Sequence, residues 1–151
     1  MRYAQHTSVS SERSKAEIER LLTRYGATSF ASGWQNDQAV IQFHMCERRI
    51  KFILPLPSKE ANEFTQSKRG ARNETMAYKL WEQATRQRWR ALALVVKAKL
   101  EAVEAEIASF EEEFMAHIVL PSGKTVGEIA IPAIEVAYKS GLMPKSLIAG
   151  W

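Results

Sequence analysis

The chain has 151 residues, of which 46% are hydrophobic and 25% are charged. These values are typical of a soluble globular protein of one domain, and they exclude a disordered, collagen-like or disulfide-rich chain. The 21 lysine and arginine residues outnumber the 17 aspartate and glutamate residues, which gives a net charge of +4. Such mild basicity is compatible with nucleic acid as a partner but does not establish one.

The sequence predicts a cytoplasmic protein. Cys46 is the only cysteine, so no intrachain disulfide can form, and this favours a reducing compartment. The N-terminal residues lack the apolar stretch of a signal peptide, and no run of apolar residues is long enough to span a membrane. We therefore expect neither secretion nor a membrane partner.

The first predicted element is a short helix. Ser14-Lys-Ala-Glu17 fits a capping box, in which a hydroxyl and a carboxylate cap the first turn. Gly26 follows at a position suited to ending the helix. Between them, apolar residues recur at the spacing of one helix face: Ile18, Leu21, Leu22 and Tyr25. Residues 1–13 are expected to form a flexible N-terminus.

Three β-strands are expected next, over residues 28–34, 38–45 and 48–54, with a turn between the first two. Laid as a hairpin around Cys46-Glu47, the second and third strands separate apolar pairs from polar pairs. The apolar pairs are Phe43 with Ile50 and Ile41 with Phe52, and the polar pairs are His44 with Arg49 and Gln42 with Lys51. Because Cys-Glu is a poor two-residue turn, a longer loop is an open alternative.

A long helix is expected after the sheet. Pro55 and Pro57 end the third strand, and the polar, basic residues 58–73 predict a mobile loop. From Glu74 to Met115 there is no proline or glycine, and good helix formers dominate. An unbroken helix of roughly 42 residues would span about 63 Å, more than the diameter of such a domain. The helix must therefore bend, break or project, and a projecting helix would need a partner such as a second copy of the chain.

The C-terminal part is predicted to contain a short strand at Ile118-Val-Leu120 and a turn at Pro121-Ser-Gly-Lys124. Thr125-Val-Gly-Glu128 then fits a second capping box, which opens a last helix to about Lys139. Pro132 leaves the course of its first turns open.

The whole pattern predicts one α+β domain over residues 14–140. It consists of a short helix, a three-stranded antiparallel meander, a long central helix, a short β turn and a C-terminal helix. Residues 141–151 are expected to form an irregular tail.

Basic residues are concentrated in the middle of the chain. Residues 48–99 contain 13 lysine or arginine residues against four glutamates, an excess of nine, whereas residues 101–113 contain six glutamates and no basic residue. Arg88 and Lys99 fall on the apolar arc of the long helix, where they are expected to snorkel or to be paired. Four other basic residues fall on one line of that helix: Lys79, Arg86, Arg90 and Lys97. Such a stripe is either a solvated face or a surface for phosphates.

Three separate segments supply the basic residues that are expected to contact a nucleic-acid backbone. They are the hairpin with Arg48, Arg49 and Lys51, the loop with Lys68, Arg69 and Arg72, and the long helix with Lys79, Arg86, Arg90 and Lys97. We expect these segments to converge on one groove. Phe64 in the loop is the candidate for stacking on an unpaired base, whereas Trp81 and Trp89 are expected to belong to the core.

No pattern points to catalysis, a metal or a cofactor. Gly123-Lys124-Thr125 lacks the earlier glycine of a phosphate-binding P-loop. The three histidines and Cys46 lack the spacing of metal ligands. The consecutive glutamates 111–113 splay around a helix and do not converge. We therefore expect a non-catalytic protein without a cofactor.

Several segments have sequences specific enough to indicate a protein family: Trp81-Glu-Gln-Ala84, residues 86–92, 97–104 and 110–121, and Thr125-Val-Gly-Glu128. They resemble the corresponding segments of a family of small uncharacterised phage and prophage proteins, over about residues 12–145. The resemblance implies a place among replication and recombination genes, in the cytoplasm of the host cell. The order of a three-strand meander and a long helix is also similar to the core of single-strand annealing recombinases.

We therefore expect a protein that binds single-stranded DNA or RNA as an oligomer and assists phage recombination or replication by annealing or loading. A recombination or replication protein of the phage or host is a further expected partner. The alternative is a protein-interaction module of a phage, either an assembly component or an inhibitor of a host factor. In that case the long helix and the acidic segment would contact protein.

Overall fold

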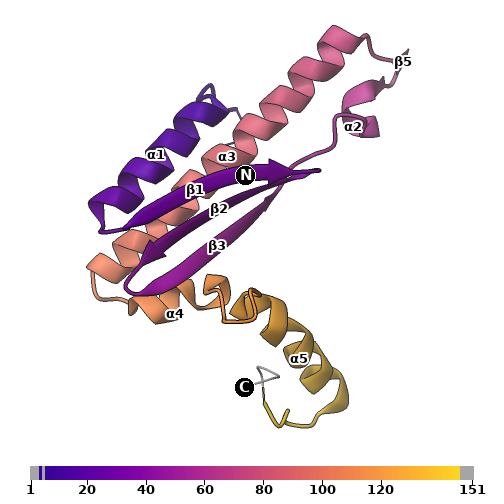
Figure 1. Cartoon of the computed structure of the whole chain (residues 1–151). Coiled ribbons are helices and arrows are strands. Elements are labelled where there is room, and N and C mark those ends of the chain that lie inside the picture. Colours follow the sequence, from indigo (N-terminus) through magenta and orange to yellow (C-terminus); the bar gives the residue numbers. More distant parts are fainter. Residues whose placement is uncertain (1–3, 5, 147–151) are drawn as a thin grey trace.

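The computed structural model describes residue 4 and residues 6–146, which form a mixed α and β fold (Figure 1). The helices are α1 (Ser11–Arg24), α2 (Asn62–Thr65), α3 (Glu74–Glu104), α4 (Phe110–Phe114), the 3₁₀ turn η1 (Met115–His117) and α5 (Val126–Ser140). The strands are β1 (Ser29–Gln35), β2 (Gln38–Met45), β3 (Arg48–Pro55), β4 (Gln66–Ser67) and β5 (Gly70–Ala71). The predicted α+β class is confirmed.

The main sheet is an antiparallel meander in the order β1-β2-β3. Its second hairpin has the predicted register, in which Phe43 lies opposite Ile50 and His44 opposite Arg49. The open question of the turn is resolved as a two-residue turn, because Cys46 and Glu47 both adopt positive φ angles, 51° and 59°. Such angles match the twist of a tight hairpin. The strong alternation of the two strands thus outweighs the poor turn propensity of Cys-Glu.

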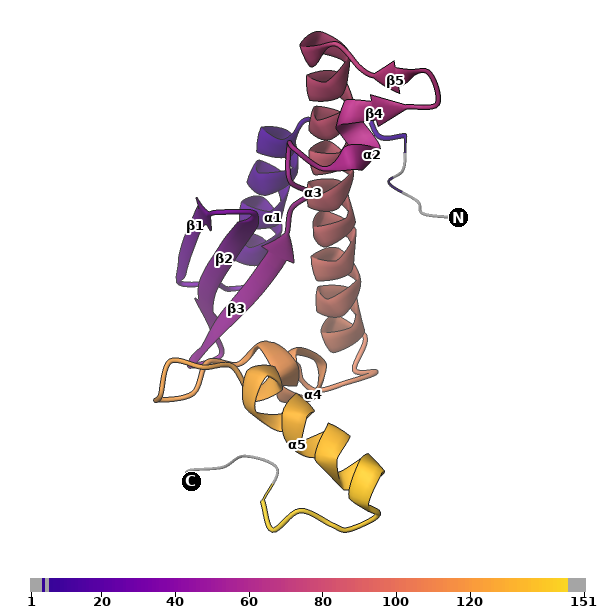
Figure 2. The same cartoon turned by 90° about the vertical axis from the view of Figure 1, so that its right-hand side faces the viewer.

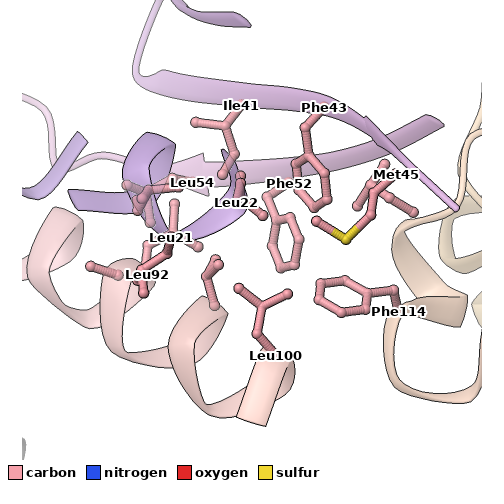
Figure 3. Packing of buried hydrophobic residues seen from close by; sticks show 14 of the residues in the cluster. Leu21, Leu22, Ile41, Phe43, Met45, Phe52, Leu54, Leu92, Leu100 and Phe114 are labelled. Atoms are coloured by element: carbon pink, nitrogen blue, oxygen red, sulfur yellow. The ribbon is translucent and has the colours of Figure 1, made fainter. Parts of the chain in front are cut away.

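One face of the sheet, the inner face, packs against α1 and α3 (Figure 2). Figure 3 shows leucines of both helices pointing toward the side chains of β2 and β3. At one end of this core, Phe114 of α4 meets Phe43 and Phe52 edge-on, with ring centroids 6.1 and 6.3 Å apart. This arrangement is the favoured one for aromatic rings. The outer face carries Gln42, His44, Arg49 and Lys51 and is left uncovered by α1 and α3.

Helix α1 begins earlier than the sequence predicts. Ser10 is the N-cap, and its Oγ accepts the backbone N–H of Arg13 at 3.1 Å. The predicted capping box at Ser14 is therefore wrong, and so is the predicted flexible segment over residues 11–13. Several serines precede the helix, and the apolar spacing does not distinguish which of them caps it. Ser14 instead lies inside α1 and is fully buried.

The predicted loop over residues 58–73 is also wrong in part, because it contains regular structure. Helix α2 forms one turn, and β4 pairs with β5 in a small hairpin. Arg72 closes the segment, since its guanidinium donates to the carbonyl oxygens of Glu63 and Phe64 at 2.8 and 3.0 Å. These are bonds between a side chain and a distant carbonyl, which local propensity does not reveal.

The predicted long helix breaks into two. Helix α3 ends at Glu104, and Glu106 then adopts a positive φ of 59°. Ser109 starts α4 with a capping box, in which it accepts from the N–H of Glu112 and its own N–H donates to the Glu112 carboxylate. The break turns the chain back so that Phe114 can enter the core. Burial of this aromatic side chain offsets the loss of helical hydrogen bonds.

The C-terminal part agrees with most of the prediction. Instead of a strand, residues 118–119 form isolated bridges to Ile50 and Thr125. Thr125 caps α5, which runs through Pro132 to Ser140. Only Gly127 of this helix is buried, and an added Cβ there would lie 2.9 Å from the carbonyl oxygen of Ala116. Residues 142–146 form no helix or strand, and the rest of the predicted tail, residues 147–151, lies outside the described residues.

Replacing Ser14 with alanine is expected to raise the free energy of unfolding by about 1 kcal/mol. Its buried Oγ has no hydrogen-bond partner within the described part of the chain. Urea unfolding measures the change, and Ser10→Ala is the control of opposite sign, because it removes the cap and costs about 1 kcal/mol. A Ser14→Ala variant less stable than the parent would contradict this reading of the helix.

His117 is expected to make the fold sensitive to mild acid. Its ring stacks on Phe52, with centroids 3.9 Å apart. Burial and the nearby Lys99 ammonium lower the pKa of His117 below its usual 6.5, against a smaller opposite effect of a hydrogen bond with the backbone of Lys51. The unfolded chain therefore binds more protons in mild acid, and stability falls as the pH drops through the usual value toward the lowered pKa.

Urea unfolding at about pH 7.5 and about pH 5.5 tests this expectation. The parent should lose more stability on acidification than His117→Gln, in which the other two histidines are retained. Equal losses in the two proteins would mean that His117 carries no part of the pH dependence.

Candidate functional site

A cleft of about 710 Å³ lies along the N-terminal half of α3. Its walls come from four places: the start of α1, the β1–β2 hairpin, the segment after β3, and α3. Trp89 and Ala39, which are 3% and 1% exposed, form its buried floor. The volume falls within the range of small-molecule sites.

Four aromatic side chains line this cleft: Trp34, Tyr78, Trp81 and Trp89. Trp34 of β1 is 79% exposed and Tyr78 of α3 is 51% exposed, which are high values for large aromatic residues. Trp34 lies opposite Ala39, whose small side chain covers little of the indole ring. Tyr78 and Trp81 are neighbours, with ring centroids 5.5 Å apart. The cleft therefore offers exposed aromatic side chains from two elements, β1 and α3.

Two lysines lie over these rings. The ammonium of Lys59 is 4.6 Å from the ring centroid of Trp81 and 5.8 Å from that of Tyr78. Lys15 of α1 lies 4.7 Å from the ring of Trp89. The Trp81 indole N–H donates to the carbonyl oxygen of Pro57 at 2.8 Å, which joins the segment after β3 to α3. These contacts hold the aromatic wall in place and put positive charge beside it.

The charges within the cleft nearly cancel. Its cations are Lys15, Lys59 and Arg86, and its carboxylates are Glu12, Asp37, Glu60 and Glu82. Arg86 is paired with Glu82 at 2.6 Å and also bonds Gln83. The Ser58 hydroxyl donates to the Glu60 carboxylate at 2.8 Å, and this hydrogen bond, with a smaller effect of the Glu60 backbone, lowers the pKa of Glu60. The interior therefore suits an uncharged planar group better than a chain of phosphates.

The predicted basic residues do not converge on one groove. Arg49 and Lys51 lie on the outer face of the sheet, opposite to the face on which α3 packs. Arg48, at the end of β3, donates to the carbonyl of Glu47 and lies 4.0 Å from Glu111. The prediction of a single groove is therefore wrong, because the linear sequence does not tell which face of the sheet each segment occupies.

The loop residues have three different roles. Lys68 and Arg69 are exposed at the turn of the β4–β5 hairpin, beside the start of α3 (Figure 2). Arg72 is held by the carbonyls of α2. Phe64 is only 5% exposed, so the prediction that it stacks on a base is wrong. Because Phe64 lies in a polar, basic segment, the sequence did not predict that it is buried.

The predicted basic stripe on α3 contains both exposed residues and residues held in ion pairs. Lys79 and Lys97 are exposed. Arg90 binds Glu17 of α1, and both side chains are about one quarter exposed, so this pair joins the two helices. Lys99 is paired as predicted, with Glu113 at 3.2 Å, whereas Arg88 is exposed.

Sequence reasoning missed Trp34, Tyr78, Lys15 and Lys59. Trp89 is buried as predicted, whereas Trp81 is half-buried and lines the cleft. The available signal for Trp34 was a large aromatic beside Gly33 at the end of a strand without charged residues. The residues of α3 that share the cleft with Trp34 depend on how α3 crosses the sheet, and the local sequence does not predict that crossing.

No group of three or more histidine, cysteine, aspartate or glutamate side chains gathers at one point among residues 4 and 6–146. None of the helices described is both long and apolar enough to cross a bilayer. Comparison with protein-family models, with curated proteins and with solved structures finds no match for this chain. The functional proposal therefore depends on the geometry of the cleft and of the charges around it.

Proposed function

We propose that the protein binds single-stranded nucleic acid without catalysis, with an unpaired base stacked in the aromatic cleft. The observation that carries the proposal is the exposure of Trp34 and Tyr78 in the lining of one cleft, with the Lys59 ammonium 5.8 Å from the Tyr78 ring centroid. Every base has a π face, so such a platform holds single strands with little dependence on sequence.

The distribution of charge supports a base inside the cleft and phosphates outside it. The near-neutral interior favours a base, whereas phosphates need cations in contact with solvent. Lys79 is exposed near the start of α3, and Lys68 and Arg69 are exposed at the turn of the β4–β5 hairpin, which lies beside this end of α3 (Figure 2). A strand whose base enters the cleft would direct its backbone past these residues.

A single strand fits better than a duplex. Bases in a duplex are stacked on one another, and removing one from the stack costs a few kcal/mol. An unpaired strand exposes its bases without that cost. The proposal extends to a role in phage recombination or replication, by annealing or by loading of another protein, and this extension is supported by the sequence resemblance alone.

Fluorescence anisotropy with labelled single-stranded DNA, single-stranded RNA and duplex DNA tests the proposal, at about 50 and about 200 mM salt. The expected result is preferential binding of single strands that weakens at the higher salt. Trp34→Ala and Tyr78→Ala should each weaken binding by about tenfold, because each removes a stacking surface. Lys59→Ala should lower affinity less and reduce the salt dependence.

Tyr138→Ala is the matched control, because Tyr138 is an 87% exposed aromatic residue on α5, outside the cleft. It should leave affinity unchanged. Equal effects of Tyr78→Ala and Tyr138→Ala, or undetectable binding of any oligonucleotide by the parent at low salt, would count against the cleft as the site.

A second candidate function is favoured by α5. This helix is rich in apolar residues, yet it projects from the body and leaves most of them exposed. The exposed apolar residues of this region are Ile131, Ile134, Val136, Tyr138, Leu142 and Met143. An exposed apolar surface of this kind is typical of a protein contact. The second candidate is therefore a protein-interaction module, either an assembly component or an inhibitor of a host factor.

The isolated protein should tolerate changes on this surface. Ile131→Ala is expected to change the free energy of unfolding by less than about 0.5 kcal/mol, because Ile131 is 63% exposed. Ile50→Ala, at a residue with 0% exposure, should cost about 3 kcal/mol under the same urea unfolding. A cost above about 1 kcal/mol for Ile131→Ala would mean that α5 already packs on a protein surface.

A further inference from the structure

The outer edge of β1 is an exposed edge of the main sheet. In the order β1-β2-β3, β1 pairs with β2 on one side, and no described strand pairs with its other side. The opposite edge of the sheet differs, because Ile118 forms a bridge to Ile50 on β3 and the N–H of Val119 donates to the carbonyl of Arg49 at 2.8 Å. One edge is thus partly covered and the other is open.

Strand β1 lacks the features that normally protect an edge. Its sequence, Ser-Phe-Ala-Ser-Gly-Trp-Gln, contains no charged residue and no proline. Its pairing with β2 runs from Ser29 to Gln35 without a bulge. Natural proteins use lysines, prolines, bulges or a covering segment to prevent an edge strand from pairing with another chain. A regular, uncharged edge is therefore suited to such pairing.

We propose that β1 pairs with β1 of a second copy of this chain, antiparallel and centred on Ser32, to form a continuous six-stranded sheet. This interface borders the cleft, which Ser32 and Trp34 also line, but its formation does not require nucleic acid. A two-fold axis at Ser32 would oppose the two copies of that residue, which is the geometry of an isologous dimer.

The sequence of β1 is complementary to itself in this register. Phe30 lies opposite the partner's Trp34, Ala31 opposite the partner's Gly33, and Ser29 opposite the partner's Gln35. Aromatic residues thus meet aromatic residues, small residues meet small ones, and polar residues meet polar ones. Directly opposed residues in an antiparallel pair lie on the same face, where such cross-strand contacts stabilise the sheet.

The same register accounts for the exposure of Trp34. In the single chain its neighbour on β2 is Ala39, which leaves 79% of Trp34 exposed. Phe30 and Trp34 both lie on the inner face, since Phe30 pairs with the buried Phe43. The partner's Phe30 would therefore supply the missing neighbour, at the margin of the cleft that Trp34 lines. An unrelated peptide strand would lack this match along the whole edge.

Charge substitution at Ser32 tests both the partner and the register, because Ser32 is exposed and opposes itself only in this dimer. The full chain should sediment as a dimer in analytical ultracentrifugation at about 100 µM. Ser32→Lys and Ser32→Asp should each raise the dimer dissociation constant more than about tenfold, because like charges would face each other across the axis. Mixing the two variants should restore the dimer.

Gln42→Lys is the control, since Gln42 is exposed on the middle strand, away from the edge. It should dimerise like the parent. Circular dichroism and urea unfolding of each variant establish that the monomer remains folded. A parent that stays monomeric at this concentration would overturn the proposal, and so would a Ser32→Lys variant that dimerises as tightly as the parent.

Discussion

The structure depends on how a three-stranded sheet buries one of its two faces. The buried residues of β2 and β3 need a cover, and the longest available element is α3. Strands of eight residues are about 26 Å long, whereas a helix of 31 residues is about 47 Å long. Helix α3 must therefore extend beyond the sheet. The aromatic cleft lies along its N-terminal half, and its other walls are α1, the β1–β2 turn and the segment after β3.

The difference in length between α3 and the sheet also explains the other end of the molecule. The chain would continue away from the core if α3 extended through Phe114, so the aromatic side chains of α4 would remain in water. The left-handed residue Glu106 and the cap at Ser109 redirect the chain. Phe110 and Phe114 then stack on each other, with centroids 4.7 Å apart, and Phe114 closes the core. One length constraint thus produces both a cleft and a break in the helix.

Local patterns predicted the parts of the fold that depend on local chemistry. Alternation of apolar and polar residues gave the β2–β3 register, and the turn residues between the first two strands placed the β1–β2 hairpin. A break of the long helix was one of the expected outcomes, but its position after Glu104 was not predicted, because Ala105 to Ala108 contains no glycine or proline and the reason for stopping lies in distant contacts. Ser14 was mistaken for a cap because Ser10 offers the same chemistry four residues earlier.

The candidate site was harder to predict, since it depends on which residues face one another. The basic residues are concentrated in sequence but divided between the outer sheet face, a hairpin and ion pairs such as Arg90 with Glu17. Conversely, Trp34 and Tyr78 are far apart in sequence and line one cleft. The period of a strand or helix shows which residues share a face, but it does not show what lies opposite that face.

Nuclear magnetic resonance of the ¹⁵N-labelled protein, titrated with a short single-stranded oligothymidine, tests most directly that the cleft is the binding site. The indole N–H signals of Trp34 and Trp81 and the backbone signals around Lys59 and Tyr78 are expected to shift together. Shifts confined to Arg49 and Lys51 on the outer face of the sheet, with the signals of the cleft unchanged, would contradict it.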